Sequence, residues 1–567
     1  MDTPNFHLSR RDVLVAAAAA AGAAAVPLGT ARAAAKYTRP NVTSHAGQQM
    51  LGIYANGVKA MLDLSPDHPH NWFRNAFVHM MDCPHGNWWF YVWHRGYIGY
   101  FEETIRTVTG EDSFVLPYWD WTQLPRIPDG MFDDYLTPAS TPFLRYTGSV
   151  AAFTRLMKPA LTEYWKGLSA DQLAQQAKRG YNTIDDVWKD ILGYTLIPCD
   201  PPKEKPDIVP IAQNQAFVIT GGARYLTRDN PKLDGKTAVN VLLDKILAGL
   251  SPKGFNVTNK AGDTDPVKSF TSSQTPSHHV PPPRSTVFST LEGFPHNKVH
   301  NYIGGYGSLG EKELQPGPFG NMTNNLSPID PVFFLHHANM DRLWDVWTRK
   351  QQAMGLSPLP SDADSDRYFN EPFLFFIDGT GNPVGAGKAK DYFETTTPFN
   401  YDYEPESGEE IIPKTVVVSS AESLPLIHSA VAANVATVTV PRAAVQRHLA
   451  ASGAQSLVAA VTLTRPMDPA GPREFDVLVN APEDVTDVTA DSPYYAGTFA
   501  LFGAPMPGMH GHGGMDLTFS VPLPQTLQAF TALAAGADAT LKIKVVPSNG
   551  QDKQAVTLKA VSLATPS

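Results

Sequence analysis

Hydrophobic and polar positions follow two different patterns along the chain, and the change falls between residues 404 and 429. Residues 36–404 alternate aromatic-rich segments of helical length with loops rich in proline, glycine and aspartate. From residue 429 onward, short β-type runs such as Phe475-Asp476-Val477-Leu478-Val479 recur between turn signals. The sequence therefore predicts a mainly α-helical unit at 36–404, a charged linker at 405–428 and an all-β sandwich at 429–567.

The N-terminal segment has a pattern of its own. Ser9-Arg10-Arg11-Asp12 precedes an alanine-rich apolar run to about Leu28, and Ala31-Arg32-Ala33 follows. This order is typical of a twin-arginine export signal at residues 1–35, and the run is too short and too weakly apolar to predict a membrane span. We therefore expect a periplasmic or secreted protein with no membrane anchor after signal removal.

Composition narrows the class of protein. The chain has 567 residues, 43% of them hydrophobic and 18% charged, and a formal net charge of −10. These values indicate a globular protein with more than one core, and they give no reason to expect nucleic acid or an anionic membrane as a partner. Cys83 and Cys199 are the only cysteines, so the fold cannot rest on a disulfide framework, although one bridge between them is formally possible.

Histidines form two clusters inside the aromatic-rich segments. The first contains His79, His85 and His94, and the second contains His296, His300 and His337. Because His296 and His300 are four residues apart, a helix presents both on one face, where they can bind one metal ion. Two all-imidazole sites without thiolate or carboxylate ligands fit copper better than magnesium, manganese or an iron–sulfur cluster, whereas zinc stays possible.

Several other histidines are not predicted to bind metal. Five are predicted to be solvated, namely His68, His70, His278, His279 and His428. His336 adjoins His337, but successive helical residues point about 100° apart, so we expect only one of the pair to face a metal. The segment from about Gly262 to Arg284 is rich in threonine, serine and proline and is predicted to be a surface loop.

Two runs around these clusters are more specific than their histidines alone. Phe90-x-x-Trp93-His94-Arg95 and Asp330-Pro-x-Phe333-Phe-x-x-His337-x-x-x-Asp341 resemble the two copper signatures of tyrosinases, catechol oxidases and molluscan haemocyanins. Beyond them, Glu474-Phe-Asp-Val-Leu-Val-Asn480 and Tyr494-Tyr-Ala-Gly-Thr-Phe499 resemble the C-terminal β-domain of plant polyphenol oxidases. The resemblance implies an antiparallel helix bundle around a binuclear copper site, followed by a jelly-roll-like β-domain.

The match has two departures. Tyr91 and Ile98 replace the residues usual in the first signature. The stretch from His79 to His85 is shorter than in plant enzymes, which leaves His70 and His68 as substitutes for His79.

The resemblance also implies an activity. Two copper ions would use dioxygen as co-substrate to convert a small phenol or catechol into an o-quinone. Export in a folded state would require metal binding beforehand, which makes a copper chaperone a possible partner. An oxygen carrier like molluscan haemocyanin, a catechol-only oxidase and an o-aminophenol oxidase stay open as alternatives. A dizinc hydrolase is less favoured because the bridging carboxylates that it would need are missing.

Roles for individual residues follow from the same resemblance. The second signature implies His337 rather than His336 as the ligand. Cys83-Pro84-His85 has the spacing at which fungal tyrosinases and molluscan haemocyanins carry a thioether between the sulfur and the histidine ring. Phe333 would pack over the ligand imidazoles, and Asp341 or backbone carbonyls would accept hydrogen bonds from their outer N–H groups.

Two further positions concern the reaction and its control. Glu292 and Asn297 would orient a water molecule as the base that deprotonates a phenol, whose pKa is about 10. The C-terminal domain would cover the copper site and keep the enzyme latent until the linker is cut or the domain is displaced. The loop Met506–Met515, rich in methionine and histidine, would approach the coppers or deliver copper, unless it is a plain flexible turn.

Overall fold

The computed structural model describes residues 35–192, 194–197, 207–210, 224–259, 261–282, 284–305, 320–385, 387–412, 424–425, 427–450, 456–464, 472–502, 516–525, 530, 538–548 and 557–566. The expected export signal except for its last residue, Cys199 and the loop Met506–Met515 lie outside these ranges. No helix in the described ranges combines the length and the apolar character that a membrane crossing needs.

A helical unit makes up the first part of the chain, as the sequence predicts. Its central helices are α2 (His45–Asp63), α3 (Trp72–Asp82), α4 (Phe90–Thr109), α12 (Asn297–Gly304) and α13 (Val332–Ala353). Helix α4 packs against both α2 and α13, and its Phe90, Trp93 and Phe101 join one large buried core. Local signals set the helix ends, because the Asn71 side chain caps α3 and Gly110 ends α4 with a positive φ of 72°.

Shorter elements surround this bundle. The outer helices are α5 (Thr141–Thr147), α6 (Val150–Lys166), α7 (Ala170–Lys178), α8 (Ile184–Leu192), α10 (Gly235–Asn240), α11 (Leu243–Gly249) and α14 (Asp362–Phe369). The short turns of helix are η1 (Asp129–Phe132), η2 (Asp134–Leu136), η3 (Glu292–His296), η4 (Asn321–Thr323), η5 (Ser327–Ile329), η6 (Ala389–Tyr392) and η7 (Glu409–Ile411). Two small antiparallel pairs join β2 (Tyr194–Ile197) to β3 (Asp207–Pro210) and β5 (Pro372–Phe373) to β6 (Gly387–Lys388).

The two ends of the helical unit are fastened together. Strand β1 (Tyr37–Arg39) pairs in parallel with β7 (Tyr401–Tyr403). The buried guanidinium of Arg39 lies 2.9 Å from Glu102 on α4 and 2.9 Å from Asp341 on α13. Because buried charges need such partners, this network fixes the start and the end of the unit against the two central helices.

The C-terminal part is a sandwich of two five-stranded sheets, with the strand orders β13-β12-β15-β10-β9 and β4-β14-β11-β16-β8, in which β4 is Ser285–Phe288. The strands are β8 (Ile427–His428), β9 (Ala430–Ala432), β10 (Val435–Pro441), β11 (Val458–Thr464), β12 (Glu474–Val479), β13 (Tyr495–Ala500), β14 (Asp516–Pro522), β15 (Asp538–Pro547) and β16 (Leu558–Ala564), and helix α15 (Arg442–Ala450) follows β10. Alternating residues of β10 point into a second core that is separate from the helical one. The predicted fold class is therefore confirmed.

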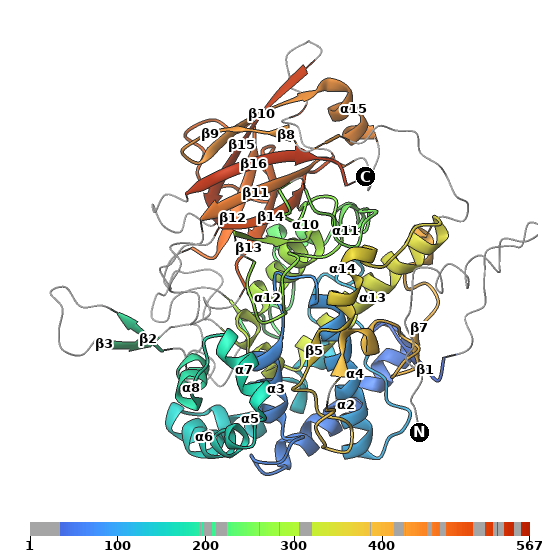
Figure 1. Cartoon of the computed structure of the whole chain (residues 1–567), viewed down its shortest axis with the longest axis vertical. Coiled ribbons are helices and arrows are strands. Elements are labelled where there is room, and N and C mark those ends of the chain that lie inside the picture. Colours follow the sequence, from blue (N-terminus) through green and yellow to red (C-terminus); the bar gives the residue numbers. More distant parts are fainter. Residues whose placement is uncertain are drawn as a thin grey trace, which may run out of the picture.

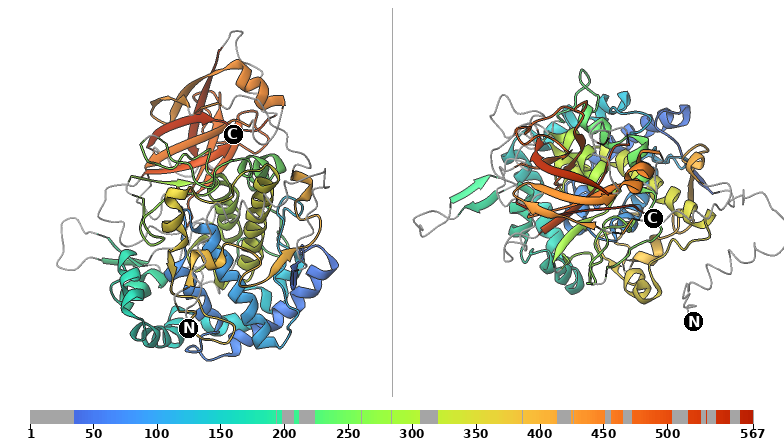
Figure 2. Two further views of the ribbon diagram at one scale, coloured as in Figure 1. Left: turned by 45° about the vertical axis from the view of Figure 1, so that its right-hand side comes forward. Right: turned by 90° about the horizontal axis from the view of Figure 1, so that it is seen from above.

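The two units share structure where they meet (Figures 1 and 2). Strand β4 (Ser285–Phe288) comes from the helical part of the sequence, yet it pairs in parallel with β14 and completes one sheet of the sandwich. Phe294 on η3 is buried in the core of the sandwich. Helices α10 and α12 contact β13 at the same junction (Figure 1).

The prediction of a surface loop near residues 262–284 is wrong for most of that segment. Val267 is fully buried against the sandwich, and Phe270 stacks on Trp347 of α13 with ring centroids 4.2 Å apart. The segment fills the space beside the junction of the two units, and its hydroxyls form internal hydrogen bonds, such as that from Thr271 to the Phe255 carbonyl at 2.8 Å. The Ser520 hydroxyl of β14 donates to the Pro266 carbonyl and joins the segment to the sandwich.

Candidate metal centre

The first histidine triplet is assembled by α3, the turn that follows it and α4. His79 lies in the last turn of α3, His85 in the turn after it and His94 in the first part of α4. One ring nitrogen from each of the three lies within 4.8 Å of the others. The Nε2 atoms of His79 and His94 are 3.4 Å apart. The structure therefore brings His79 into the cluster, whereas the Nε2 of His70, its proposed substitute, lies 2.9 Å from the Asp378 carbonyl.

The second triplet is assembled by η3, α12 and α13. Its Nε2 atoms converge, because that of His337 lies 3.4 Å from that of His296 and 3.2 Å from that of His300. The segment Glu292–His296 forms a π-helical turn that contains Pro295. Proline has no backbone N–H and therefore interrupts the regular hydrogen bonding of an α-helix. π-helical turns of this kind are frequent at functional sites.

The two triplets face each other across a narrow space. The rings of His94 and His337 stack with centroids 4.3 Å apart, and those of His85 and His296 with centroids 5.9 Å apart. Phe333 lies over both groups, with its ring centroid 4.1 Å from that of His337 and 5.0 Å from that of His79. This packing agrees with the place expected for Phe333.

Backbone carbonyls orient three of these rings. The Nδ1 atoms of His79, His94 and His300 lie 2.8, 2.7 and 2.8 Å from the carbonyl oxygens of Asn325, Phe90 and Met322. A ring that donates from Nδ1 keeps its lone pair on Nε2, which here faces the centre. Asp341 does not take part, because it is bound by Arg39 and Arg95.

Burial keeps these rings neutral. It lowers the pKa of His79 to about 3 and that of His296 to about 4. Burial likewise lowers the pKa of His85, His94 and His337 well below the ordinary value. A neutral imidazole is the form that binds metal, so the rings need not lose a proton at neutral pH before a metal ion enters.

His336 reaches the centre as well, which the sequence argument about neighbouring helical residues did not anticipate. One of its ring nitrogens belongs to the same close group as those of His296, His300 and His337. Hydrogen bonding distinguishes the neighbours, because Trp121 Nε1 donates to His336 Nδ1 at 3.1 Å. A neutral His336 therefore carries its proton on Nε2 and has no lone pair there for a metal.

Cys83 and His85 lie side by side. Cys83 is buried and free, and its Sγ is 3.4 Å from Nδ1 of His85. The Nε2 of His85 is buried without a hydrogen-bond partner among the described residues. Gly86 follows with a positive φ of 67°, which turns the chain sharply toward α4.

Glu292 and Asn297 both lie next to the centre, but protein groups occupy their polar atoms. Glu292 accepts hydrogen bonds from the Gly86 N–H at 2.6 Å and from the Ser272 hydroxyl. Burial raises the pKa of Glu292 to about 8, against the lowering effect of those two donors. Asn297 Oδ1 lies 2.9 Å from His296 Nδ1, and its Nδ2 donates to the Ala500 carbonyl at 3.2 Å.

The β-sandwich contributes a side chain to the centre that sequence reasoning missed. Phe502, two residues beyond β13, places its ring centroid 4.7 Å from that of His85 and 4.6 Å from that of His300. The ring thus bridges the two triplets from the outside. The only sequence signal for this role of Phe502 was its position, as an aromatic residue between a predicted strand and the Met506–Met515 loop.

Three of the histidines predicted to be solvated are buried. His70, His278 and His279 are each 3% exposed, and the two neighbours bind Asp82 at 3.0 and 2.9 Å. Their carboxylate partner is far away in the sequence, so no local pattern could show that they are buried. His428, by contrast, is exposed on β8, as expected.

Two facing triplets of neutral imidazoles, carried by a helix bundle and covered by a β-sandwich, define a class of proteins with a paired metal centre. The chain belongs to the tyrosinase family, because residues 68–350 match the common central domain of tyrosinase. Residues 429–565 match the C-terminal domain of chloroplastic polyphenol oxidase. The family implies a binuclear copper centre.

Individual relatives agree with this placement. The chain is 22% identical to a chloroplastic polyphenol oxidase of Spinacia oleracea over 386 residues, which cover 65% of this chain and 47% of that protein. It is 23% identical to a tyrosinase of Hahella sp. (strain CCB-MM4) over 481 residues, or 83% of this chain and 80% of that one. A solved structure of latent aurone synthase, a polyphenol oxidase, covers 94% of this chain and 90% of its own with 19% identity and a TM-score of 0.50, which supports the fold.

Proposed function

We propose that this protein oxidises small phenols or catechols to o-quinones with dioxygen, and that two copper ions are held by His79, His85, His94, His296, His300 and His337. The observation that carries the proposal is the pair of facing triplets, in which ring nitrogens converge within 4.8 Å. The donor set fits copper, because neutral imidazole binds both of its common oxidation states and no carboxylate or thiolate lies in either triplet. The unpartnered Nε2 of His85 is the kind of buried atom that a metal would satisfy. When bound, the copper pair would supply the redox chemistry that couples dioxygen reduction to substrate oxidation.

The protein's own part is to orient ligands and to handle the substrate's proton. Phe333 packs on His79 and His337 and limits the tilt of both rings. Glu292 and Asn297 would hold the water that removes the phenol proton, which requires the amide of Asn297 to be released from Ala500. Because Ala500 belongs to the sandwich, hydroxylation of phenols would then require the sandwich to move. Oxidation of catechols would depend less on this movement.

The sandwich would keep the enzyme latent. Phe502 occupies the outer side of the centre, where a flat phenolic ring would have to enter. Buried ion pairs hold the sandwich in place, because Lys298 on α12 lies 2.5 Å from Glu474 and Lys236 on α10 lies 2.7 Å from Asp476. Substrate would thus gain access only when the segment after β13 moves away.

Oxygen uptake by the copper-loaded protein, measured on a monophenol and its matching catechol after mild displacement of the sandwich, tests the activity. We expect oxygen consumption and a visible quinone product on both substrates. A haemocyanin-like carrier would bind oxygen without consuming substrate, and a dizinc centre would show no visible absorption on oxygenation. Consumption on an o-aminophenol alone would assign the related oxidase activity.

The proposed role of Glu292 in holding the water is tested by Glu292→Gln, which removes the ionisable carboxyl and keeps the shape. Hydroxylation of the monophenol should fall more than oxidation of the catechol. Equal losses on both substrates would show that Glu292 has no selective role in deprotonation.

Two further parts of the proposal concern maturation. The twin-arginine signal would export the folded protein, with copper supplied beforehand, if necessary by a chaperone. Cys83 and His85 would form a thioether, in which an S–H and a ring C–H bond are replaced by an S–C bond and the hydrogens pass with their electrons to dioxygen. The short distance of 3.4 Å between Sγ and Nδ1 supports this step. The mass of the peptide would fall by the mass of the hydrogens removed.

A further inference from the structure

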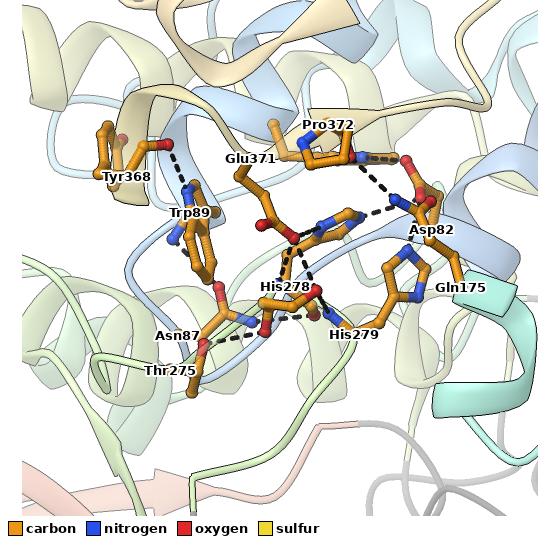
Figure 3. A network of polar contacts seen from close by, with 12 residues as sticks. Asp82, Asn87, Trp89, Gln175, Thr275, His278, His279, Tyr368, Glu371 and Pro372 are labelled. Atoms are coloured by element: carbon orange, nitrogen blue, oxygen red, sulfur yellow. Dashed lines mark hydrogen bonds and ion pairs between the residues drawn. The ribbon is translucent and has the colours of Figure 1, made fainter. Parts of the chain in front are cut away.

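A second buried polar network joins Asp82, three residues after His79, to His278 and His279 (Figure 3). Asp82 is the last residue of α3 and is fully buried. Its Oδ1 accepts hydrogen bonds from His278 Nε2 at 3.0 Å and His279 Nε2 at 2.9 Å. Its Oδ2 accepts one from Trp93 Nε1 at 2.6 Å. Both oxygens of this carboxylate thus accept hydrogen bonds from buried side chains of other segments.

The partners of Asp82 are themselves fixed. His278 lies between two carboxylates, because its Nδ1 is 2.6 Å from Oε1 of Glu371 (Figure 3). Arg179, at the end of α7, donates from Nε to His279 Nδ1 at 2.6 Å. Burial alone would lower the pKa of His278, but Asp82 and Glu371 hold it above its ordinary value. In this Asp82 network, protonated His278 and Arg179 therefore balance the charges of Asp82 and Glu371. Buried charges need such partners.

Hydrogen bonding also argues against a third metal ion here. Asp82, His278 and His279 have the spacing of a metal site. However, Arg179 donates to one nitrogen of His279, so the neutral ring carries its proton on the nitrogen that faces Asp82. His278 donates from both nitrogens to carboxylates. Neither ring offers a lone pair toward the carboxylate, so the network is held by hydrogen bonds.

The Asp82 network is hydrogen-bonded to the turn that carries Cys83 and His85. Arg179 Nη2 donates to the carbonyl of Cys83, and the Asn87 side chain donates to the His278 carbonyl at 3.3 Å. The Cys83 N–H makes the last bond of α3, to the His79 carbonyl at 2.9 Å, and the turn from Pro84 to Gly86 is in neither a helix nor a strand. Its geometry is therefore set by the residues that hold it from outside.

We infer that the Asp82 network is a positioning site, which holds the turn so that the Cys83 thiol faces the His85 ring and His85 Nε2 faces the metal centre. Asp82 fixes the start of the turn, and Arg179 fixes its first carbonyl. His279 joins Arg179 to Asp82, and His278 joins Asp82 to Glu371. The inference rests on the proposed function only in naming His85 as a copper ligand and Cys83 as its cross-linking partner.

Substitutions at Arg179 separate geometry from charge. Arg179→Gln removes the charge and one of the two donated bonds, whereas Arg179→Lys keeps the charge but cannot donate to His279 and Cys83 together. Gln175→Ala is the matched control, because Gln175 lies on the same helix and donates to the Pro372 carbonyl at 3.1 Å without touching the turn. All proteins are compared well below their unfolding temperatures, so that loss of fold does not count as loss of positioning.

Three measurements on the full-length protein report on the geometry of the turn: the thioether fraction, the copper affinity and the alkylation rate of Cys83. After copper loading in air, peptide mass gives the fraction of Cys83 in the thioether, which should fall in Arg179→Gln, fall less in Arg179→Lys and stay unchanged in Gln175→Ala. Copper affinity of the first triplet should drop about 10- to 100-fold in Arg179→Gln, the loss typical when a group that orients a ligand is removed. In copper-free protein, native Cys83 should be alkylated faster in Arg179→Gln than in wild type, with Cys199 resolved as a separate peptide.

The outcomes separate this inference from the proposed function. If wild type binds no copper, the proposed function fails, and the alkylation rate of Cys83 in copper-free protein still decides about positioning. If wild type binds copper but forms no thioether, copper affinity decides. Arg179→Gln protein that matches wild type in cross-linking, copper affinity and Cys83 protection would overturn the inference.

Discussion

At the scale of single residues, the direction of three rings at the centre is set by the hydrogen bond of the nitrogen on the far side. Carbonyls of Asn325, Phe90 and Met322 accept from three rings, so the opposite nitrogens keep free lone pairs. Trp121 has the reverse effect on His336, because it donates to the ring and leaves a proton pointing inward. Two adjacent histidines on one helix thus acquire different chemistry from their partners rather than from their place on α13.

This difference predicts unequal results at the two neighbours. His337→Ala should lose about one of the two expected copper ions per chain, because its Nε2 is at the convergence of the second triplet. His336→Gln, whose amide oxygen can still accept from Trp121, should keep both. Metal analysis of the purified proteins measures the copper content. Loss of copper in His336→Gln but not in His337→Ala would show that His336 is the ligand. His94→Ala should lose about one ion in the same way.

Glu292 gives the copper-free protein a specific pH dependence of stability. Its pKa is about 8 in the folded state and 4.5 when free, so the folded state holds the proton more tightly. The stabilising contribution is therefore complete below pH 4.5 and is lost as pH rises to about 8, at about 1.4 kcal/mol per pH unit. Glu292→Gln has no such loss, since its amide can still accept from Gly86 and donate to Ser272.

Denaturant unfolding of copper-free wild type and Glu292→Gln at pH 5 and pH 8 measures this effect. The variant should be the more stable protein at pH 8, and the difference should shrink at pH 5. Parallel curves for the two proteins would mean that the carboxyl does not keep its proton in the folded state.

At the scale of elements, local patterns predict some parts of the site and not others. The spacing of His296 and His300 and the signature through His337 are local, and they singled out three histidines whose ring nitrogens the structure brings together. His278 and His279 could not be placed that way, because they bind Asp82 from 196 and 197 residues away. Composition also misled, since a serine- and threonine-rich segment is buried when its hydroxyls find internal acceptors.

The end of β13 is predicted to control access to the centre. Loss of the Phe502 ring in Phe502→Ala removes aromatic contacts with His85 and His300, which are worth about 0.5–1.5 kcal/mol. The open fraction, and with it the rate of catechol oxidation, should rise about two- to tenfold at unchanged copper content. Tyr494→Ala, at the other end of the same strand, is the matched control and should leave the rate unchanged. A Phe502→Ala rate equal to wild type would remove Phe502 from the account of latency.

At the scale of the whole molecule, the two units are joined by more than a linker. They share a sheet through β4, and Phe294 of the helical part is buried in the core of the sandwich. The ion pair of Lys298 and Glu474 is almost fully buried at the same junction. Breaking one partner of such a pair costs about 3–5 kcal/mol, so the sandwich is held even without its tether.

Cutting the linker is therefore expected to have little effect by itself. A chain cut between residues 413 and 423 should elute as one species in gel filtration and oxidise catechols at nearly the rate of the uncut protein. Activity should rise only when mild denaturant separates the units. Immediate activation on cutting would show that the tether, through its effective concentration, holds the sandwich closed. A truncated chain ending near Tyr403 would leave β4 without its partner strand, and we expect it to be poorly soluble.

The pairing of β4 with β14 also orders events during synthesis of the protein. Residues 285–288 can take their place in the sheet only after residues 516–519 have been made, because each supplies the other's hydrogen bonds. Glu292 and His296 follow directly after β4 on η3, whose Phe294 needs the finished core of the sandwich. On a ribosome the second triplet must therefore wait for almost the whole chain, whereas the first needs residues only as far as Glu371, which holds His278. Loading of a metal pair is then an event of the finished polypeptide, and a chain that stalls before β14 would lack a complete second triplet.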